Sequence, residues 1–155
     1  MKASLKRKIG RSDKVDFPEW ELSDIDAKVD SGAYTSSIHC ENIEPLISNG
    51  EHRIRFIIHE QGNPIVIESK IYACKQVRNS FGQSEYRYFV KTIIQLFEES
   101  YPIELALTNR ASMKYPVLLG RKLLQGRFVI DVTNKNLSYK EKIKKETKSE
   151  KISNA

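Results

Sequence analysis

The sequence predicts an all-β domain, either a barrel or a sandwich, and three observations support this fold class. Eight or more short segments alternate apolar and polar residues or are rich in β-branched residues, as strands are. Turn-forming residues separate these segments, and the body lacks the alternation of strands with helices that indicates a parallel βαβ sheet. A length of 155 residues suits one domain with a buried core.

The expected elements follow one another along the chain with turns between them. Residues 17–22 contain a proline, which is unwelcome in a central strand, and they predict an edge strand or an entry segment. A hairpin with a polar, glycine-bearing tip is predicted over residues 77–90, and a short helix near residues 121–125 is the only helix expected in the body. The other strands are predicted at residues 25–29, 34–40, 42–47, 52–59, 65–73, 92–97, 102–108, 115–121 and 126–132.

The positive charge of the chain lies at its two ends. The net charge is +6, made up of +5 in residues 1–14, −3 in residues 15–134 and +4 in residues 135–155. We therefore expect a basic arm over 1–14, one folded domain over 15–133 and a charged, flexible tail over 134–155. Basic tails attract RNA, ribosomes or other polyanions at low salt, but disordered tails that only aid solubility fit the sequence equally well.

The composition argues against several classes of protein. No apolar run reaches the ~18–20 residues of a membrane span, and no apolar stretch of a signal peptide follows the basic N-terminus. Cys40 and Cys74 lack the spacing of a thiolate zinc site or of a disulfide framework. We expect a cytoplasmic protein with reduced thiols, no membrane contact and both cysteines buried as apolar side chains.

One short stretch has a composition that packing alone does not explain. Asp30, Ser31 and Gly32 follow the alternating segment 25–29 and precede a hydroxyl-rich strand. A tight glycine turn at a strand end is a natural way to hold a carboxylate at the floor of a cleft. Asp-Ser-Gly is also good turn chemistry, so on this motif alone a structural turn residue is the simpler interpretation.

A second motif, Val-Leu-Leu-Gly-Arg at 117–121, changes this balance. Together with Asp-Ser-Gly-Ala at 30–33, it resembles the active-site loop and the underlying strand of a retroviral-type aspartic protease subunit. Most of residues 8–132 also resembles a bacterial family of retropepsin-like aspartic endopeptidases, formerly labelled ATP-dependent zinc proteases. This resemblance implies a closed acid-protease (retropepsin-type) β-barrel with a flap-like hairpin near residues 78–88. Its further motifs are Ala-Lys-Val-Asp-Ser-Gly-Ala at 27–33, Gly-x-x-Glu-x-Arg at 82–87, Pro-Ile-Glu-Leu-Ala-Leu-Thr-Asn-Arg at 102–110, and Leu-Leu-Gly-Arg followed by Gly-Arg-Phe within 118–128.

The resemblance also implies the chemistry of the site. Aspartic peptidases use two carboxylates that face one water molecule and share a proton, because like charges so close together cannot both ionise. The chain offers a single Asp-Ser-Gly, and Asp131 lies in an apolar strand without a glycine turn. We therefore expect a homodimer in which each copy contributes Asp30. Ser31 is expected to hydrogen-bond the partner loop, and Gly32 to permit the sharp turn.

A peptide or protein is the implied substrate, and an acidic peptide is the more specific hypothesis. Some relatives are associated with the ligase that adds glutamates to a ribosomal protein tail. Retroviral subunits pair the arginine of the Gly-Arg turn with an acid, but that position here is Tyr34, which leaves Arg121 available for a substrate carboxylate. Ion pairs inside the protein are an equally good interpretation of the arginines. The predicted substrate-binding residues are Ala33, Tyr34, Arg87, Arg110 and Arg121, with Arg127 as a further helper.

No metal or cofactor is expected. The sequence has neither a His-Glu-x-x-His motif nor a P-loop, and His39 and Cys40, as neighbours on a strand, point to opposite faces. The alternative to an enzyme is a non-catalytic binding module of the same fold. Such a module would keep the cleft and use the basic tails to dock on RNA or on a ribosomal protein.

Overall fold

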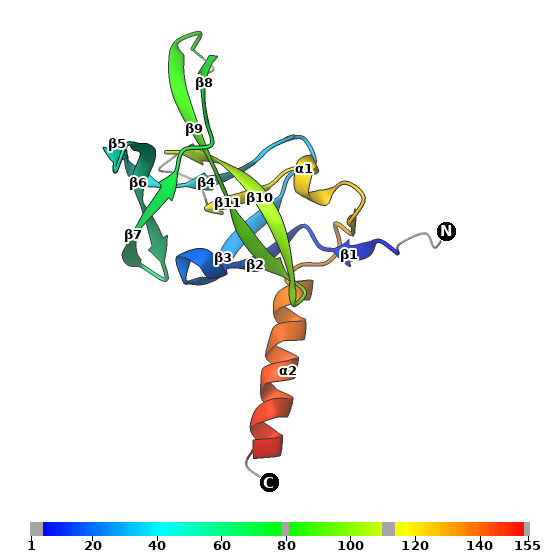
Figure 1. The fold of residues 1–155 in the computed structure, drawn as a ribbon. Helices are drawn as coiled ribbons and strands as arrows, with labels where there is room; N and C mark the ends of the chain where they lie inside the picture. The colour runs from blue at the N-terminus through cyan, green and yellow to red at the C-terminus, as the bar shows by residue number, and fades with distance from the viewer. Residues whose placement is uncertain (1–4, 79–80, 110–113, 154–155) are drawn as a thin grey trace.

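Six strands close into a β-barrel in the structure, a computed structural model that describes residues 5–78, 81–109 and 114–153 (Figure 1). The order around the barrel is β10-β4-β11-β3-β2-β9, and the pairing of β9 with β10 closes the ring. The all-β barrel is therefore confirmed. The barrel strands are β2 (Ser12–Phe17), β3 (Leu22–Val29), β4 (Ser36–His39), β9 (Ser84–Leu96), β10 (Glu99–Thr108) and β11 (Val117–Leu119).

The β9–β10 hairpin is the element that closes the barrel. Its turn places two non-glycine residues, Phe97 and Glu98, in the left-handed region with φ of 54° and 65°. Such a conformation costs roughly 1–2 kcal/mol per residue, and the long antiparallel ladder and the burial of Phe97 offset this cost. Near the same end, Gln95 of β9 pairs with Asp16 of β2, so β9 is paired with β10 on one side and with β2 on the other.

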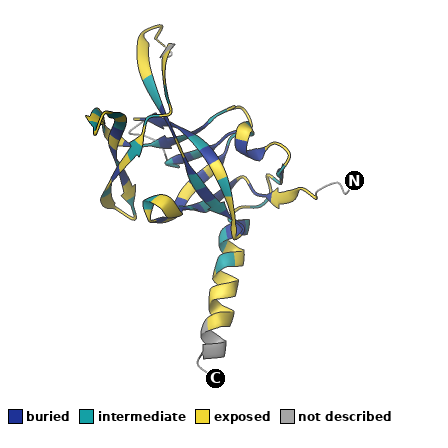
Figure 2. Cartoon of the chain, in the orientation of Figure 1, coloured by how far each residue is buried: buried dark blue, intermediate teal, exposed yellow. Residues whose placement is uncertain are grey.

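The outer half of β9 forms a second hairpin with β8 (Ala73–Arg78). The two strands pair from Ala73 opposite Phe89 to Arg78 opposite Ser84. Figure 1 shows this hairpin projecting beyond the barrel, and Figure 2 shows that much of its outer part is exposed. The predicted hairpin is thus present, although residues 79–80 at its tip lie outside the described part of the chain.

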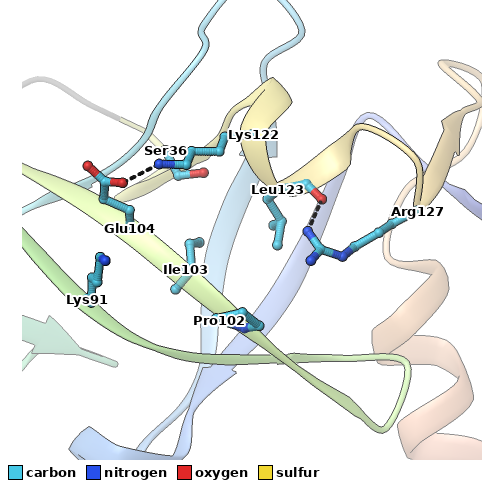
Figure 3. Close-up of a pocket in the computed structure, with 8 residues that line it drawn as sticks. All are labelled: Ser36, Lys91, Pro102, Ile103, Glu104, Lys122, Leu123 and Arg127. Carbon is cyan, nitrogen blue, oxygen red and sulfur yellow. Dashed lines mark hydrogen bonds and ion pairs between the residues drawn. The ribbon is translucent and has the colours of Figure 1, made fainter.

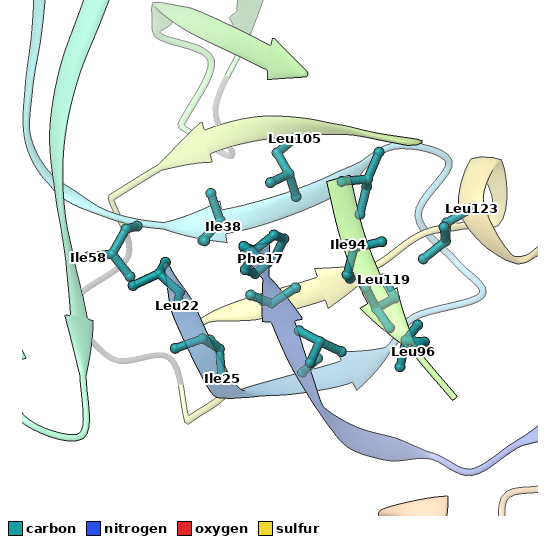
Figure 4. Close-up of a cluster of buried hydrophobic side chains, with 14 of the residues drawn as sticks. Phe17, Leu22, Ile25, Ile38, Ile58, Ile94, Leu96, Leu105, Leu119 and Leu123 are labelled. Carbon is teal, nitrogen blue, oxygen red and sulfur yellow. The ribbon is translucent and has the colours of Figure 1, made fainter. Parts of the chain in front are cut away.

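Aliphatic side chains from the barrel strands fill its interior (Figure 4). Each fully buried Leu, Ile or Phe of this kind contributes about 1.5–3 kcal/mol through removal of apolar surface from water. The strands alternate buried and more exposed residues because successive side chains point to opposite faces. Side chains with at most 1% exposure include Phe17, Leu22, Ile38, Ile94, Leu96, Leu105 and Leu119.

A separate three-stranded sheet packs beside the barrel. It consists of β5 (Glu41–Ser48), β6 (Glu51–Glu60) and β7 (Asn63–Lys70), joined by tight turns at 49–50 and 61–62. Trp20 connects the two bodies, since its ring centroid lies 5.5 Å from that of Phe17 in the barrel and 5.6 Å from that of Phe56 in β6. Of the two alternatives predicted for residues 17–22, the structure has no edge strand at Pro18–Trp20 but the short helical turn η1, which carries Trp20.

Two segments near the ends of the described chain contact the folded body, in the regions where the sequence predicts a basic arm over 1–14 and a charged tail over 134–155. β1 (Arg7–Ile9) pairs in parallel with β12 (Phe128–Ile130), which follows the predicted short helix α1 (Arg121–Leu124). Ile9 is fully buried. Gly10 packs so tightly on Asn134 that a Cβ atom would overlap its backbone.

Helix α2 (Leu137–Ser153) follows and is held by polar contacts at its first turns. The buried carboxylate of Asp13 accepts hydrogen bonds from the backbone N–H of Ser138 at 2.9 Å and of Tyr139 at 3.1 Å. Burial raises the pKa of Asp13, and these N–H groups oppose that rise. Lys142 bonds to Asp16 and Asp24, one turn further along.

The rest of α2 projects from the body and is largely exposed (Figures 1 and 2). Within residues 5–78, 81–109 and 114–153, no helix combines the length and apolar character that crossing a membrane would take.

Replacement of Asp13 by alanine should destabilise the fold by about 1–3 kcal/mol, because buried N–H groups at the start of α2 lose their acceptor. Urea unfolding of the full chain measures this loss. Asp26→Ala is the matched control, since the exposed Asp26 carboxylate makes only a surface ion pair with Lys14, a contact of about 0–1 kcal/mol. Equal effects of the two variants would contradict the capping role of Asp13.

The two cysteines differ, and the expectation that both are buried is wrong for one of them. Cys40 is buried, which raises its pKa to about 12, whereas Cys74 on β8 is exposed. At pH 8 the Cys40 thiol is therefore almost wholly protonated, and the thiolate is the nucleophile. Iodoacetamide should therefore modify only Cys74 in the native protein and both cysteines in denaturant, as read by peptide mass spectrometry. Rapid native modification of Cys40 would show that its site is open.

Candidate active site

The Asp30 loop begins where β3 ends and is fixed by backbone hydrogen bonds. The Asp30 N–H donates to the carbonyl of Leu119 at 2.9 Å, which ties the loop to β11. Within the turn, Gly32 N–H donates to Oδ1 of Asp30 at 3.0 Å, and Ala33 N–H donates to the Asp30 carbonyl at 3.2 Å. One carboxylate oxygen is thus oriented by the turn that follows it, while Asp30 is half-buried and Ser31 is exposed.

Gly120 lets the Leu-Leu-Gly-Arg strand pass directly beneath this loop. β11 runs parallel to β3 with Leu119 opposite Val29, which places Gly120 beside the loop. A Cβ atom at Gly120 would lie 2.7 Å from the Tyr34 carbonyl oxygen, closer than packed atoms approach. The residues after Gly120 then donate to the loop: Arg121 N–H to the Ala33 carbonyl at 2.8 Å and Lys122 N–H to that of Tyr34 at 2.9 Å.

A buried serine completes this support. Ser36 is 2% exposed, and its Oγ accepts a hydrogen bond from the Gly120 N–H at 2.9 Å. The hydroxyl-rich character of the strand after Asp30, visible in the sequence, therefore has a structural use at this position. The loop, Ser36 and the Gly-Arg turn form one hydrogen-bonded unit.

The Arg121 side chain is engaged by the loop, although the sequence left it without a partner. Its Nη1 donates to the Ser31 carbonyl at 2.9 Å, and its guanidinium lies 5.7 Å from the ring centroid of Tyr34. A backbone carbonyl and an aromatic face thus take the place of the acid found in retroviral subunits. A guanidinium has further N–H donors, so a role for Arg121 in substrate binding stays a prediction.

The structure gathers Asp30, Ser31, Gly32, Ala33, Tyr34 and Arg121 into one cluster. Arg87 lies apart from it on β9 of the projecting hairpin, where its Nη2 pairs with Glu85 at 3.0 Å. Arg110 falls outside the described residues. Of the predicted substrate-binding arginines, only Arg121 is therefore seen against the loop.

Asp131 has a local role as the acceptor of a turn. Its carboxylate accepts hydrogen bonds from the Thr133 hydroxyl at 2.6 Å, the Thr133 N–H at 3.0 Å and the Asn134 amide at 2.8 Å. The Thr133 hydroxyl, then its N–H, holds the pKa of Asp131 below the ordinary value. Across the described ranges, the His, Cys, Asp and Glu side chains form no group of three or more able to hold a metal ion.

A pocket of about 270 Å³ lies between α1 and β10, and the sequence did not indicate it (Figure 3). Neither Asp30 nor Arg121 lines this pocket, so it is separate from the Asp30 carboxylate. Its side chains come from β4, β9, β10, α1 and the segment between α1 and β12, which are far apart in the chain, so no local motif could have revealed it. They are Ser36, Lys91, Pro102, Ile103, Glu104, Lys122, Leu123 and Arg127.

The barrel, the Asp-Ser-Gly turn and the Gly-Arg strand beneath it define a retropepsin-like protein. A model of the family described as RimB-like, retropepsin-like aspartic endopeptidase RimB, matches residues 8–141, and the chain belongs to this family. The crystal structure of Lpg0085 from Legionella pneumophila, titled as a protein of unknown function (DUF785), has the same fold. It superposes with a TM-score of 0.71 at 24% identity over 86% of this chain and 99% of that one.

Curated relatives carry a different name. A protein of Shewanella pealeana named probable alpha-L-glutamate ligase is 39% identical over 127 residues, which are 79% of this chain and 28% of that protein. A protein of the same name from Parasynechococcus marenigrum is 42% identical over 127 residues, 79% of this chain and 27% of its own length. The chain thus spans little more than a quarter of these relatives.

Ser36→Ala should destabilise the protein by about 1–3 kcal/mol, because the Gly120 N–H would be buried without an acceptor. Ser37→Ala is the matched control, since the neighbouring side chain points to the other face of β4 and is only half-buried. Thermal unfolding compares the two variants. A Ser36→Ala protein as stable as the Ser37→Ala protein would show that this hydrogen bond does not hold the Gly-Arg turn.

Proposed function

We propose that the protein is an aspartic-type endopeptidase in which Asp30 supplies the catalytic carboxylate. The observation that carries the proposal is the seating of the Asp30 turn on Gly120 and Arg121. A turn residue needed only for its shape would not require an arginine, a buried serine and a glycine without room for Cβ beneath it. This support fixes the plane and position of one carboxylate, which is what proton transfer to and from a water molecule demands.

The second carboxylate comes from another copy of the chain. Two Asp30 side chains across a twofold axis would share one proton, because two adjacent negative charges repel strongly. The ionised member takes a proton from water as the water oxygen bonds to the peptide carbonyl carbon. The protonated member donates its proton to the carbonyl oxygen. When the tetrahedral intermediate collapses, the C–N bond breaks and the amine leaves with the proton first taken from water. The other Asp30 takes a proton back from a hydroxyl of the intermediate, so the product is a carboxylic acid and the pair again shares one proton.

The exposed Ser31 and the β8–β9 hairpin have supporting roles in this proposal. The Ser31 hydroxyl reaches the partner's loop and holds the two carboxylates coplanar. The hairpin covers an extended peptide and excludes water during the reaction. Backbone hydrogen bonds to the extended peptide would supply affinity that does not depend on the sequence of the peptide.

An acidic, glutamate-bearing peptide is the substrate class that we propose. The curated relatives place a region like this chain within proteins named as probable glutamate ligases. A hydrolase joined to such a ligase would remove glutamates from the same peptide tails. Arg121, whose guanidinium has spare donors beside the loop, would contact one of the substrate carboxylates.

Asp30→Asn should abolish cleavage of a peptide that ends in several glutamates, with a loss of at least about a thousandfold in kcat, because the asparagine cannot accept the proton from water. Mass spectrometry of the products measures this rate. Asp26→Asn changes an exposed residue of β3, the strand that leads into the Asp30 loop; it is the control and should retain activity. Undiminished cleavage by Asp30→Asn would remove Asp30 from the mechanism. Analytical ultracentrifugation of both variants tests whether the dimer is intact.

A non-catalytic binding module is the second candidate, and one observation favours it. Three exposed lysines, Lys140, Lys144 and Lys148, recur every four residues and so share one face of the projecting helix α2. A module that docks on RNA through this face would keep its affinity after Asp30→Asn. That affinity would fall steeply with salt and with the substitutions Lys144→Gln and Lys148→Gln.

A further inference from the structure

The pocket between α1 and β10 combines positive charge at its rim with an apolar floor (Figure 3). We propose that it is an exosite that binds a glutamate side chain of an acidic peptide, apart from the Asp30 loop. This inference deepens the proposed function and rests on it for the identity of the peptide.

Charge in the pocket favours an anionic ligand. Lys91, Lys122 and Arg127 line it together with one acid, Glu104. Glu104 is almost fully buried and forms an ion pair with Lys122, which raises the pKa of that lysine and keeps it charged. With this pair neutral, Lys91 and Arg127 leave the pocket with a net positive charge. The surrounding body, residues 15–134, is net negative, so the pocket is a local exception.

Both uncompensated cations are held in place by aromatic rings. The Arg127 guanidinium lies 5.4 Å from the ring centroid of Tyr101, and its Nη1 donates to the Leu123 carbonyl at 3.0 Å. The Lys91 ammonium lies 3.6 Å from the ring centroid of Tyr72. These contacts leave N–H donors of both groups unused. They also restrict both side chains before binding, so the side chains lose less conformational entropy when a ligand binds.

The floor of the pocket matches the methylene part of a glutamate. Pro102 and Ile103 of β10 and Leu123 of α1 supply aliphatic surface between the charged side chains in Figure 3. A volume of about 270 Å³ is just below the range of small-molecule sites, which span roughly 300–1,000 Å³. The pocket therefore suits one or two amino-acid side chains rather than a nucleotide cofactor.

A peptide is favoured over nucleic acid as the ligand. Single-stranded nucleic acid is held largely by stacking of its bases on aromatic rings. None of the described residues that line the pocket is aromatic, and the nearby rings of Tyr72 and Tyr101 already carry cations.

The pocket also shares its framework with the Asp30 loop. Lys122, whose side chain lines the pocket, donates its backbone N–H to the Tyr34 carbonyl of that loop. Ser36 lines the pocket and bonds Gly120 beneath the loop. One segment of a peptide could then contact the Asp30 loop while another occupies the pocket. The two contacts would strengthen each other by raising the effective concentration of the second segment.

Fluorescence anisotropy with labelled hexaglutamate and hexaglutamine peptides tests the exosite. All proteins carry Asp30→Asn, so that binding is read without turnover. The double variant Lys91→Gln/Arg127→Gln should bind hexaglutamate at least about tenfold more weakly and leave hexaglutamine binding unchanged. Arg55→Gln/Lys70→Gln removes the same charge from the three-stranded sheet and should change the affinity less than about twofold.

The exosite would be overturned if the pocket variant bound hexaglutamate with unchanged affinity, or if the control variant lost as much affinity as the pocket variant. Displacement of the peptide by a hexameric RNA at equal concentration would overturn it as well. If Arg127→Gln disturbs folding, the amide resonances of the protein that carries Asp30→Asn alone give a second test. Hexaglutamate should then shift the backbone amide resonances of Ile103, Lys122 and Leu123, and unshifted resonances would reject the site.

Failure of the exosite is distinguishable from failure of the proposed function. Cleavage that depends on Asp30, with no effect of the pocket variant on hexaglutamate binding, leaves the peptidase and removes the exosite. Selective hexaglutamate binding in the pocket, without any cleavage by the wild-type protein, leaves the exosite and removes the peptidase.

Discussion

The seating of one loop on one glycine is the constraint on which the candidate site depends. The carbonyls of Ala33 and Tyr34 accept hydrogen bonds from the two residues after Gly120, and Gly120 has no space for a side chain. A β-sheet alone cannot hold a strand-to-strand loop in a single conformation, because loop backbone groups have no ladder partners. Here β11 and the first turn of α1 supply those partners. The loop is therefore held in one conformation, and so is the Asp30 carboxylate that it carries.

This support requires the barrel to be closed. β11 reaches the loop only because it lies between β3 and β4, and β4 in turn pairs with β10. The pairing of β9 with β10 completes the ring. The first half of β9, away from the turn that joins it to β10, pairs with β8 in the projecting hairpin. The elements that present the carboxylate and the element expected to cover a bound peptide thus belong to one continuous hydrogen-bonded sheet.

The all-β class could be predicted from local patterns, whereas the closed barrel and the Asp30 loop with its supporting strand were implied by the resemblance of the motifs to a known family. Alternation indicated most strands, and Asp-Ser-Gly with Leu-Leu-Gly-Arg indicated the loop and its support. The partner of Arg121 could not be predicted, since a carbonyl of Ser31 and the face of Tyr34 leave no signature in residue type.

The docking of α2 was missed for a similar reason. The helix has no apolar stripe, and its anchors are the side chains of Asp13, Asp16 and Asp24, more than a hundred residues earlier. The pocket between α1 and β10 was missed because its cations converge only in the folded chain.

The contact between Asp13 and the start of α2 has a consequence for synthesis of the protein. It joins residues separated by 125 positions, and β1 pairs with β12 over a similar distance. A chain emerging from the ribosome cannot pair Ile9 until β12 has been made, or give the buried Asp13 carboxylate its N–H donors until residues 138 and 139 have been made. Because such distant contacts must wait for loop closure, folding of this domain is expected to be slow for its size.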